Sequence, residues 1–169
     1  MEFKIFAKDY IRNLTNLLNF IDLDEYEKFF NTILSIKNDS TIYVLGNGGS
    51  SAAASHMVND LAIGLKVRDI KTINAISLSD NSAINFAIAN DIGFENVFYM
   101  QLKGILKPND IIIAISCSGN SLNIIKAIKY AKEIGSKIVG LTGFDGGELR
   151  KLSDIKIQKK KKKGEYGLV

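Results

Sequence analysis

Hydrophobic residues recur every three or four positions through residues 3–20 and 23–37, and no proline interrupts either stretch. This spacing predicts two amphipathic helices. From residue 39 onward, short and wholly apolar runs alternate with helical stretches, a pattern typical of an α/β protein. The apolar runs predict five strands, at residues 41–46, 73–78, 111–116, 137–143 and 154–158. The other stretches predict helices near residues 50–64, 81–90, 93–105, 121–134 and 146–152.

Strands that are apolar throughout and separated by helices indicate a parallel sheet covered on both faces. We therefore expect the α/β fold class: a three-layer αβα sandwich with a five-stranded parallel sheet, preceded by two N-terminal helices. A chain of 169 residues, of which 46% are hydrophobic, buries one core, so residues 1–169 are expected to form a single domain. Within it we expect a helical extension (1–38), the αβα core (39–158) and a basic tail (159–169).

The net charge of +4 raises the question of nucleic-acid binding. The five lysines at 159–163 account for more than the whole positive excess, so we expect no basic face and no nucleic-acid partner. The single cysteine, Cys117, excludes an internal disulfide and suits a reducing compartment. The apolar runs are too short to span a bilayer, so we expect a cytoplasmic protein with no membrane partner.

Two turns at predicted strand ends combine glycine and serine: "GNGGSS" at 46–51 and "SCSGNS" at 116–121. In open parallel sheets, ligands bind at the carboxyl ends of strands. Glycine lets the backbone approach an anion, serine hydroxyls donate hydrogen bonds, and the following helix presents free N–H groups. Both loops thus fit a phosphate or a polar sugar. The candidate binding residues are Asn47, Gly48, Ser50, Ser116, Ser118, Asn120 and Ser121.

Other interpretations of these loops stay open at this point. A nucleotide site would also use glycine loops, but "GNGGSS" lacks the third glycine of the dinucleotide fingerprint and neither loop has the P-loop lysine. Asp80, after the second strand, is the one feature that a dinucleotide site would use. Each loop alone is also compatible with a tight turn whose serine caps a helix.

The chain's one histidine, His56, lies four residues before Asp60, so both occupy one face of the helix that begins at the first loop. From the residues alone, a functional role is not the only interpretation. His56 is also compatible with simple packing, and Asp60 with a solvated helix surface. Cys117 has no second histidine to activate it as a nucleophile, so we expect it to be a packing residue.

Four ordered motifs together resemble a known family. They are "GNGGSSAAASH", "AIANDIGFENVF", "SCSGNSLNIIKAIKYAKEIGSK" and "GLTGFDGGELRKLSD". They are similar to the sugar isomerase (SIS) domain, and specifically to the phosphoheptose isomerases. Enzymes of that family interconvert sedoheptulose 7-phosphate and D-glycero-D-manno-heptose 7-phosphate, for bacterial lipopolysaccharide or capsule. The resemblance implies an aldose–ketose isomerase that moves a proton through an enediol and requires no redox cofactor.

The resemblance also implies residue roles. Asp60 matches the isomerisation base, and His56 an active-site residue or, as in zinc-binding members, a Zn²⁺ ligand. The serine loop, with Ser116, Ser118, Asn120 and Ser121, matches the phosphate site. Sugar contacts fall on Asn47, Gly48, Ser50 and Asp91. A phosphorylated sugar as ligand and a homo-oligomer, most often a tetramer, complete what the family implies.

The sequence departs from the family pattern at several positions. Asp60 is one methylene shorter than the usual glutamate, and Ala53 and Gly64 replace polar residues of some members. Relatives continue past "GLV" into a helix that supplies the general acid and further metal ligands. Two explanations of this difference are open. Either the sequence is a shortened form of an isomerase, or the chain truly ends at Val169. A non-catalytic SIS module that binds phosphosugars or acts as an adaptor is the alternative function.

Overall fold

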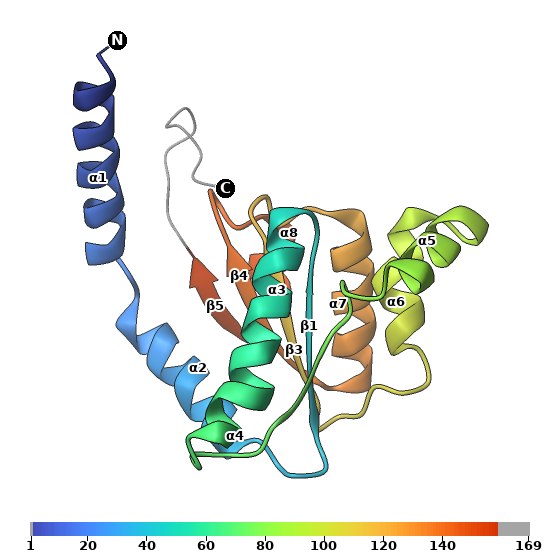
Figure 1. Ribbon diagram of the computed structural model, residues 1–169. Coiled ribbons are helices and arrows are strands. Elements are labelled where there is room, and N and C mark those ends of the chain that lie inside the picture. The colour runs from blue at the N-terminus through green and yellow to red at the C-terminus, as the bar shows by residue number, and fades with distance from the viewer. Residues whose placement is uncertain (1, 159–169) are drawn as a thin grey trace.

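The computed structural model describes residues 2–158, which form a five-stranded, fully parallel sheet between two layers of helices (Figure 1). The strands lie in the order β2-β1-β3-β4-β5. Their bounds are β1 Thr41–Gly46, β2 Asn74–Ser77, β3 Ile111–Ser116, β4 Lys137–Thr142 and β5 Ile155–Gln158. The expected α/β sandwich with a five-stranded parallel sheet and two N-terminal helices is thereby confirmed.

The helices fall where the hydrophobic spacing predicts them, with two exceptions. The α-helices are α1 Phe3–Asn19, α2 Leu23–Ser35, α3 Gly49–Asn59, α4 Leu65–Val67, α5 Ser82–Asp91, α6 Val97–Leu102, α7 Leu122–Ile134 and α8 Gly147–Leu152. The helix expected at 50–64 contains a π-helical turn, η1 Asp60–Gly64, before α4. The helix expected at 93–105 begins as a 3₁₀ turn, η2 Phe94–Asn96, because Gly93 has a positive φ and breaks the regular helix.

Each face of the sheet carries its own hydrophobic core, because the strands bury apolar side chains on both sides. One core joins the sheet to α6, α7 and α8, with Phe98, Leu102 and Ile128 almost fully buried. The opposite core joins it to α2 and α3, with Ile33 and Ala54 buried. These two layers fix the carboxyl ends of all five strands along one edge.

The strand order creates a topological switch point between β1 and β3. The chain leaves β1 toward β2 on one side and later returns to β3 on the other side. In doubly wound sheets the crevice at this point is the usual ligand site. The two glycine and serine loops, at 46–51 and 116–121, follow β1 and β3 and so meet at this crevice.

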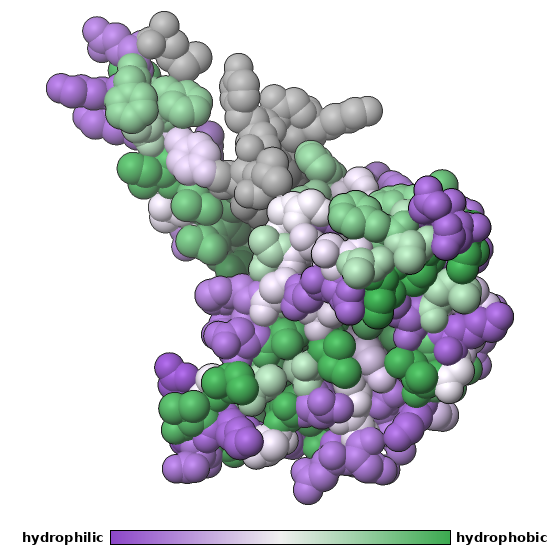
Figure 2. All heavy atoms as spheres, turned by 45° about the vertical axis from the view of Figure 1, so that its right-hand side comes forward, coloured by the Kyte–Doolittle hydropathy of each residue, from purple (hydrophilic) through white to green (hydrophobic). Residues whose placement is uncertain are grey.

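The first helix, α1, stands apart from the layers and none of its residues is buried (Figure 1). Its apolar side chains form a stripe that is largely exposed in this chain, as the space-filling view shows (Figure 2). The members that are more than half exposed are Phe3, Ile11 and Leu18. In residues 2–158 we find no helix with the length and apolar character needed to cross a membrane.

Glu25 on α2 contacts the edge strand β5. Its Oε2 accepts a hydrogen bond from the backbone N–H of Lys156 on β5 at 2.6 Å. The Lys28 ammonium 2.6 Å from Oε1 and this N–H together hold the pKa of Glu25 below its ordinary value of 4.5. Edge strands with free N–H groups invite pairing with other chains, so this contact also protects the sheet.

We expect Glu25→Gln to reduce stability by about 1 kcal/mol at pH 7. Because the folded pKa is lowered, the contribution is present above the unfolded pKa and is lost as the pH falls through the folded value. Urea unfolding at pH 7 and at strongly acidic pH measures this difference, with exposed Glu27→Gln as the control. A loss that is equal at both pH values would contradict the role of the Glu25 charge.

Candidate functional site

A pair of asparagine side chains joins the two loops at the switch point. The Nδ2 of Asn47, in the first loop, donates to Oδ1 of Asn123 at 2.9 Å. The Nδ2 of Asn123, in the first turn of α7, donates in return to Oδ1 of Asn47 at 2.8 Å. Residues that are 76 positions apart in the sequence are therefore in direct contact across the crevice.

The serine loop, defined here as residues 116–121, is shaped by its own hydroxyl groups. The Oγ of Ser116, which is 4% exposed, accepts from the N–H of Gly119 at 3.2 Å. The Oγ of Ser118 accepts from the N–H of Asn120 at 3.2 Å, and its own hydrogen stays free to donate. Ser116 thus stabilises the loop from its buried side, whereas Ser118 lies on its exposed surface.

A third loop, at residues 143–147, braces the serine loop from behind. The N–H of Gly143 donates to the carbonyl of Cys117 at 3.0 Å, and the N–H of Leu149 donates to the carbonyl of Gly119 at 2.9 Å. The Oδ1 of Asn120 accepts from the N–H of Glu148 at 3.0 Å, while its Nδ2 donates to the carbonyl of Ser118. The amide of Asn120 therefore connects the serine loop to α8.

The end of the serine loop offers groups suited to an anion. Ser121 is the N-cap of α7, a helix of 13 residues, and its side chain makes no cap hydrogen bond within the described residues. Its hydroxyl and the N–H groups of Leu122 and Asn123, at the start of α7, are thus available to a ligand. A helix N-terminus with such donors favours a phosphate group.

The first loop turns sharply from β1 into α3. Gly48 has a φ of 53°, and Ser50 donates its N–H to the carbonyl of Asn47 at 2.9 Å. The hydroxyl of Ser79, from the loop after β2, donates to the carbonyl of Gly46 at 2.8 Å. Asp80 accepts hydrogen bonds from Ser77 and Ser55, so its carboxylate ties β2 to α3.

His56, on α3, and Asp60, which directly follows α3, lie farther along the helix from the first loop. The Nε2 of His56 is 3.4 Å from Oδ2 of Asp60, and the two side chains are 78% and 64% exposed. Asp60 comes eleven residues after Gly49, which places it about 16 Å along the helix axis from the loop. It is also the first residue of the π-helical turn, a feature that is frequent at functional sites.

His56 is the residue predicted to bind Zn²⁺, and Asp60 is the carboxylate beside it. A catalytic zinc ion takes three protein ligands. Among residues 2–158, no group of three or more His, Cys, Asp or Glu side chains is placed to hold a metal ion. His56 and Asp60 by themselves are therefore too few to hold such an ion.

Two other residues considered in the sequence analysis, Asp91 and Cys117, are both exposed. Asp91 ends α5, is exposed, and accepts a hydrogen bond from its neighbour Asn90 at 2.8 Å. Cys117 was expected to pack in the interior, and this expectation is wrong, because its side chain is exposed on the serine loop. The hydrogen bond from the N–H of Gly143 holds the backbone of Cys117, while the side chain of Cys117 is exposed.

Sequence reasoning missed Asn123 and Ser79. Asn123 is a polar residue among the apolar positions of α7, where Ile124, Ala127 and Ile128 are buried. An amide in a buried stripe needs a partner, so this break in the pattern was a usable signal. Ser79 gave no such signal, because a serine after a strand is common in turns.

Comparison with protein families gives one clear match. The model of the SIS domain matches residues 9–143, which include both loops and the His56–Asp60 turn.

The relatives and solved structures agree with this match. A phosphoheptose isomerase of Leptospira biflexa is 44% identical over 124 residues, which is 73% of this chain and 64% of that protein. A probable phosphoheptose isomerase of Thermoplasma volcanium is 37% identical over 147 residues, covering 86% and 74%. The structure of the phosphoheptose isomerase GmhA from Neisseria gonorrhoeae superposes with a TM-score of 0.77 at 28% identity, covering 93% of this chain and 82% of that one. The chain thus spans 64% of the length of relatives such as the Leptospira protein.

Proposed function

The chain belongs to the SIS domain family, and from this premise we propose that it is an aldose–ketose isomerase acting on a heptose phosphate. The substrate pair is sedoheptulose 7-phosphate and D-glycero-D-manno-heptose 7-phosphate. The observation that carries the proposal is the meeting of two serine- and glycine-containing loops at the switch point, with Asp60 on the helix that follows the first loop. The names of the relatives support the choice of substrate class.

Phosphate binding falls to the serine loop. The hydroxyls of Ser118 and Ser121 donate to phosphate oxygens, and the N-terminus of α7 contributes its positive dipole end. Ser116 is buried and Asn120 is exposed, and the hydrogen bonds of both side chains keep the loop in shape. Asn47, Gly48, Ser50 and Asp91 are the proposed contacts to the sugar chain.

The chemical step needs a base for the carbon-bound proton and an acid for the oxygens. In the forward direction the carboxylate of Asp60 takes a proton from C1 of the ketose, the C2 carbonyl oxygen takes a proton from an acid that solvent can supply, and an enediol forms. The same proton, or one from solvent, then returns to C2 while the C1 oxygen loses its hydrogen and becomes the aldehyde. The sequence of steps changes no oxidation state overall and consumes no cofactor.

The test of this function is proton exchange by the full-length gene product. Sedoheptulose 7-phosphate is incubated in deuterated water, and NMR follows both the appearance of the aldose and the incorporation of deuterium. Isomerisation with exchange supports the proposal. Binding of the phosphosugar without exchange rejects it and favours a non-catalytic SIS module.

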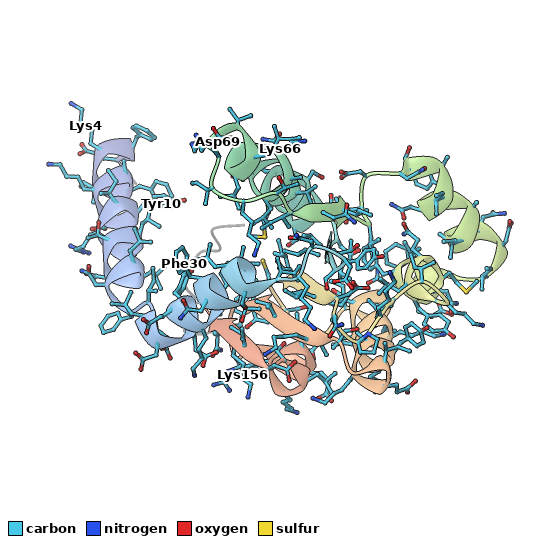
Figure 3. The ribbon with its side chains drawn as sticks, turned by 90° about the horizontal axis from the view of Figure 1, so that it is seen from below. Lys4, Tyr10, Phe30, Lys66, Asp69 and Lys156 are labelled. Carbon is cyan, nitrogen blue, oxygen red and sulfur yellow. The ribbon has the colours of Figure 1, made fainter. Side chains whose placement is uncertain are left out.

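We propose in addition that the protein works as a homo-oligomer. The apolar stripe of α1 is left uncovered in the single chain, and an isolated helix is only marginally stable in water. In the view of Figure 3, Tyr10 projects from α1 toward the side on which α4, with Lys66 and Asp69, lies. A second copy, with the same stripe, is a partner that satisfies both chains at once.

The position of Asp60 supports the same conclusion. It lies about 16 Å along the helix from Gly49 at the first loop. Its side chain is 64% exposed, so its carboxylate is available to a substrate on a neighbouring copy. We therefore propose that one subunit binds the phosphate and another supplies the base.

Leu18→Glu is expected to reduce the oligomer to smaller species, because it places a charge in the α1 stripe. The matched control is Asn16→Glu, which adds the same charge on the opposite, polar face of α1. Light scattering coupled to size exclusion measures the mass of each variant. Equal masses for both variants would show that the stripe does not hold copies together.

Sharing of the site between copies has its own test. Asp60→Asn and Ser121→Ala each impair one half of a site. When the two variants are unfolded together and refolded as mixed oligomers, about a quarter of the sites regain both intact halves. Recovery to about that level supports the shared site, and no recovery shows that base and loop come from one chain.

A further inference from the structure

Asn123 is buried where the surrounding positions of α7 are apolar. Its side chain is 1% exposed and lies beside the buried Ile124 and Ala127. Burying an amide without hydrogen bonds destabilises a protein, so such a residue needs partners of fixed geometry. Its partner is Asn47, one of the proposed sugar contacts.

The backbone of α7 decides which way this amide points. The N–H of Ile124 donates to Oδ1 of Asn123 at 3.0 Å. The oxygen is thereby fixed on that side, and the Nδ2 must face Asn47, to whose oxygen it donates at 2.8 Å. Asn47 in turn has to present its own Nδ2 to Asn123.

The result is that Asn47 has a defined set of groups left for a ligand. An asparagine amide has two donor hydrogens and two acceptor lone pairs. The pair with Asn123 uses one of each, so one N–H and one lone pair remain on the half-buried Asn47. A sugar hydroxyl, which both donates and accepts, matches such an edge.

We propose that Asn123 is a positioning residue that fixes the side chain of Asn47 toward the sugar and ties the first loop to the serine loop. It touches no ligand itself, because it is buried behind Asn47. The proposal rests on the proposed function in one respect, namely that the sugar of the bound phosphosugar contacts Asn47. Ser79 holds the backbone of the same loop at Gly46, so Asn123 adds the control of the side chain.

The variant that tests this role is Asn123→Asp. A carboxylate still accepts from Ile124 and from Asn47, but it has no hydrogen for Oδ1 of Asn47. We expect the KM for sedoheptulose 7-phosphate to rise about tenfold, which corresponds to one lost hydrogen bond, with the inhibition constant for inorganic phosphate within twofold of wild type. Exposed Asn109→Asp, in the turn before β3, adds the same charge at the other edge of the sheet and leaves both constants unchanged.

The pH profile separates positioning from a purely structural role. Burial raises the pKa of a carboxyl group, so the introduced acid becomes protonated at moderately low pH and regains a donor hydrogen. The KM of Asn123→Asp is therefore expected to approach that of wild type as the pH falls. A KM ratio that does not change with pH overturns the proposal, as does an equal rise in KM and in the phosphate inhibition constant, which would mean that the serine loop is disturbed.

Failure of the proposed function would be recognised separately. If the wild-type protein does not turn over sedoheptulose 7-phosphate, the isomerase assignment fails, and the asparagine pair is then tested by thermal unfolding. Asn47→Ala, Asn123→Ala and the double variant are compared in a cycle. A double variant with the Tm of Asn123→Ala shows that the two side chains act as a unit, whereas additive Tm losses overturn the pairing.

Discussion

Asp60→Asn is expected to lower kcat about a thousandfold while leaving the KM for the phosphosugar within about threefold. Asparagine has nearly the same size as aspartate but cannot take up a proton at neutral pH. The exposed side chain of Asp60 makes no contact that stabilises the core, so the fold should be unaffected. Deuterium incorporation into sedoheptulose 7-phosphate measures the step directly, since exchange requires the base even when product release is slow.

Two further variants define what the Asp60 result means. Asp39→Asn removes an exposed carboxylate in the turn before β1 and should leave kcat unchanged. Asp60→Glu restores the acid that the family usually carries, so it should retain activity or increase it, because the longer side chain reaches farther toward the substrate. A rate that survives Asp60→Asn would place the base on another residue.

The second large effect is expected at Gly119, in the middle of the serine loop. A Cβ at this position would lie 2.0 Å from the carbonyl oxygen of Gly146, and the residue has a φ of 65°. An alanine side chain there must push the serine loop away from the loop at 143–147, since the atoms that it would meet belong to the backbone of Gly146 and Gly147. We expect Gly119→Ala to cost about 3 kcal/mol or more of unfolding free energy and to abolish binding of phosphate.

Gly104 provides the matched control for this substitution. It also has a positive φ, 82°, but nothing lies within 4 Å of an added Cβ. Gly104→Ala should therefore cost only about 1 kcal/mol, from backbone strain alone, and leave phosphate binding intact. Urea unfolding gives the stabilities, and the rise of Tm with inorganic phosphate gives the binding. If both variants lose the same stability and keep the phosphate response, the contact between the two loops is unimportant.

Much of the fold was predictable because its signals are local. The strands at 41–46 and 111–116 are runs of apolar residues, and the structure ends β1 and β3 at those same positions. The 3₁₀ turn at Phe94–Asn96 and the π-helical turn at Asp60 were not predicted. Both depend on how a helix fits its neighbours, which the spacing of hydrophobic residues does not encode.

The sequence by itself determined the alternation of strands and helices, the parallel sheet and the two loops that point to a phosphosugar. These follow from the wholly apolar runs of the strands, from the helical spacing of 3.6 residues and from the chemistry of glycine and serine at strand ends. Only the tertiary structure decided that β1 lies beside β3, that Asn47 meets Asn123, and that α1 is left without cover. The physical reason is that such contacts join residues far apart in the chain, and their pairing is chosen by the packing of the whole molecule.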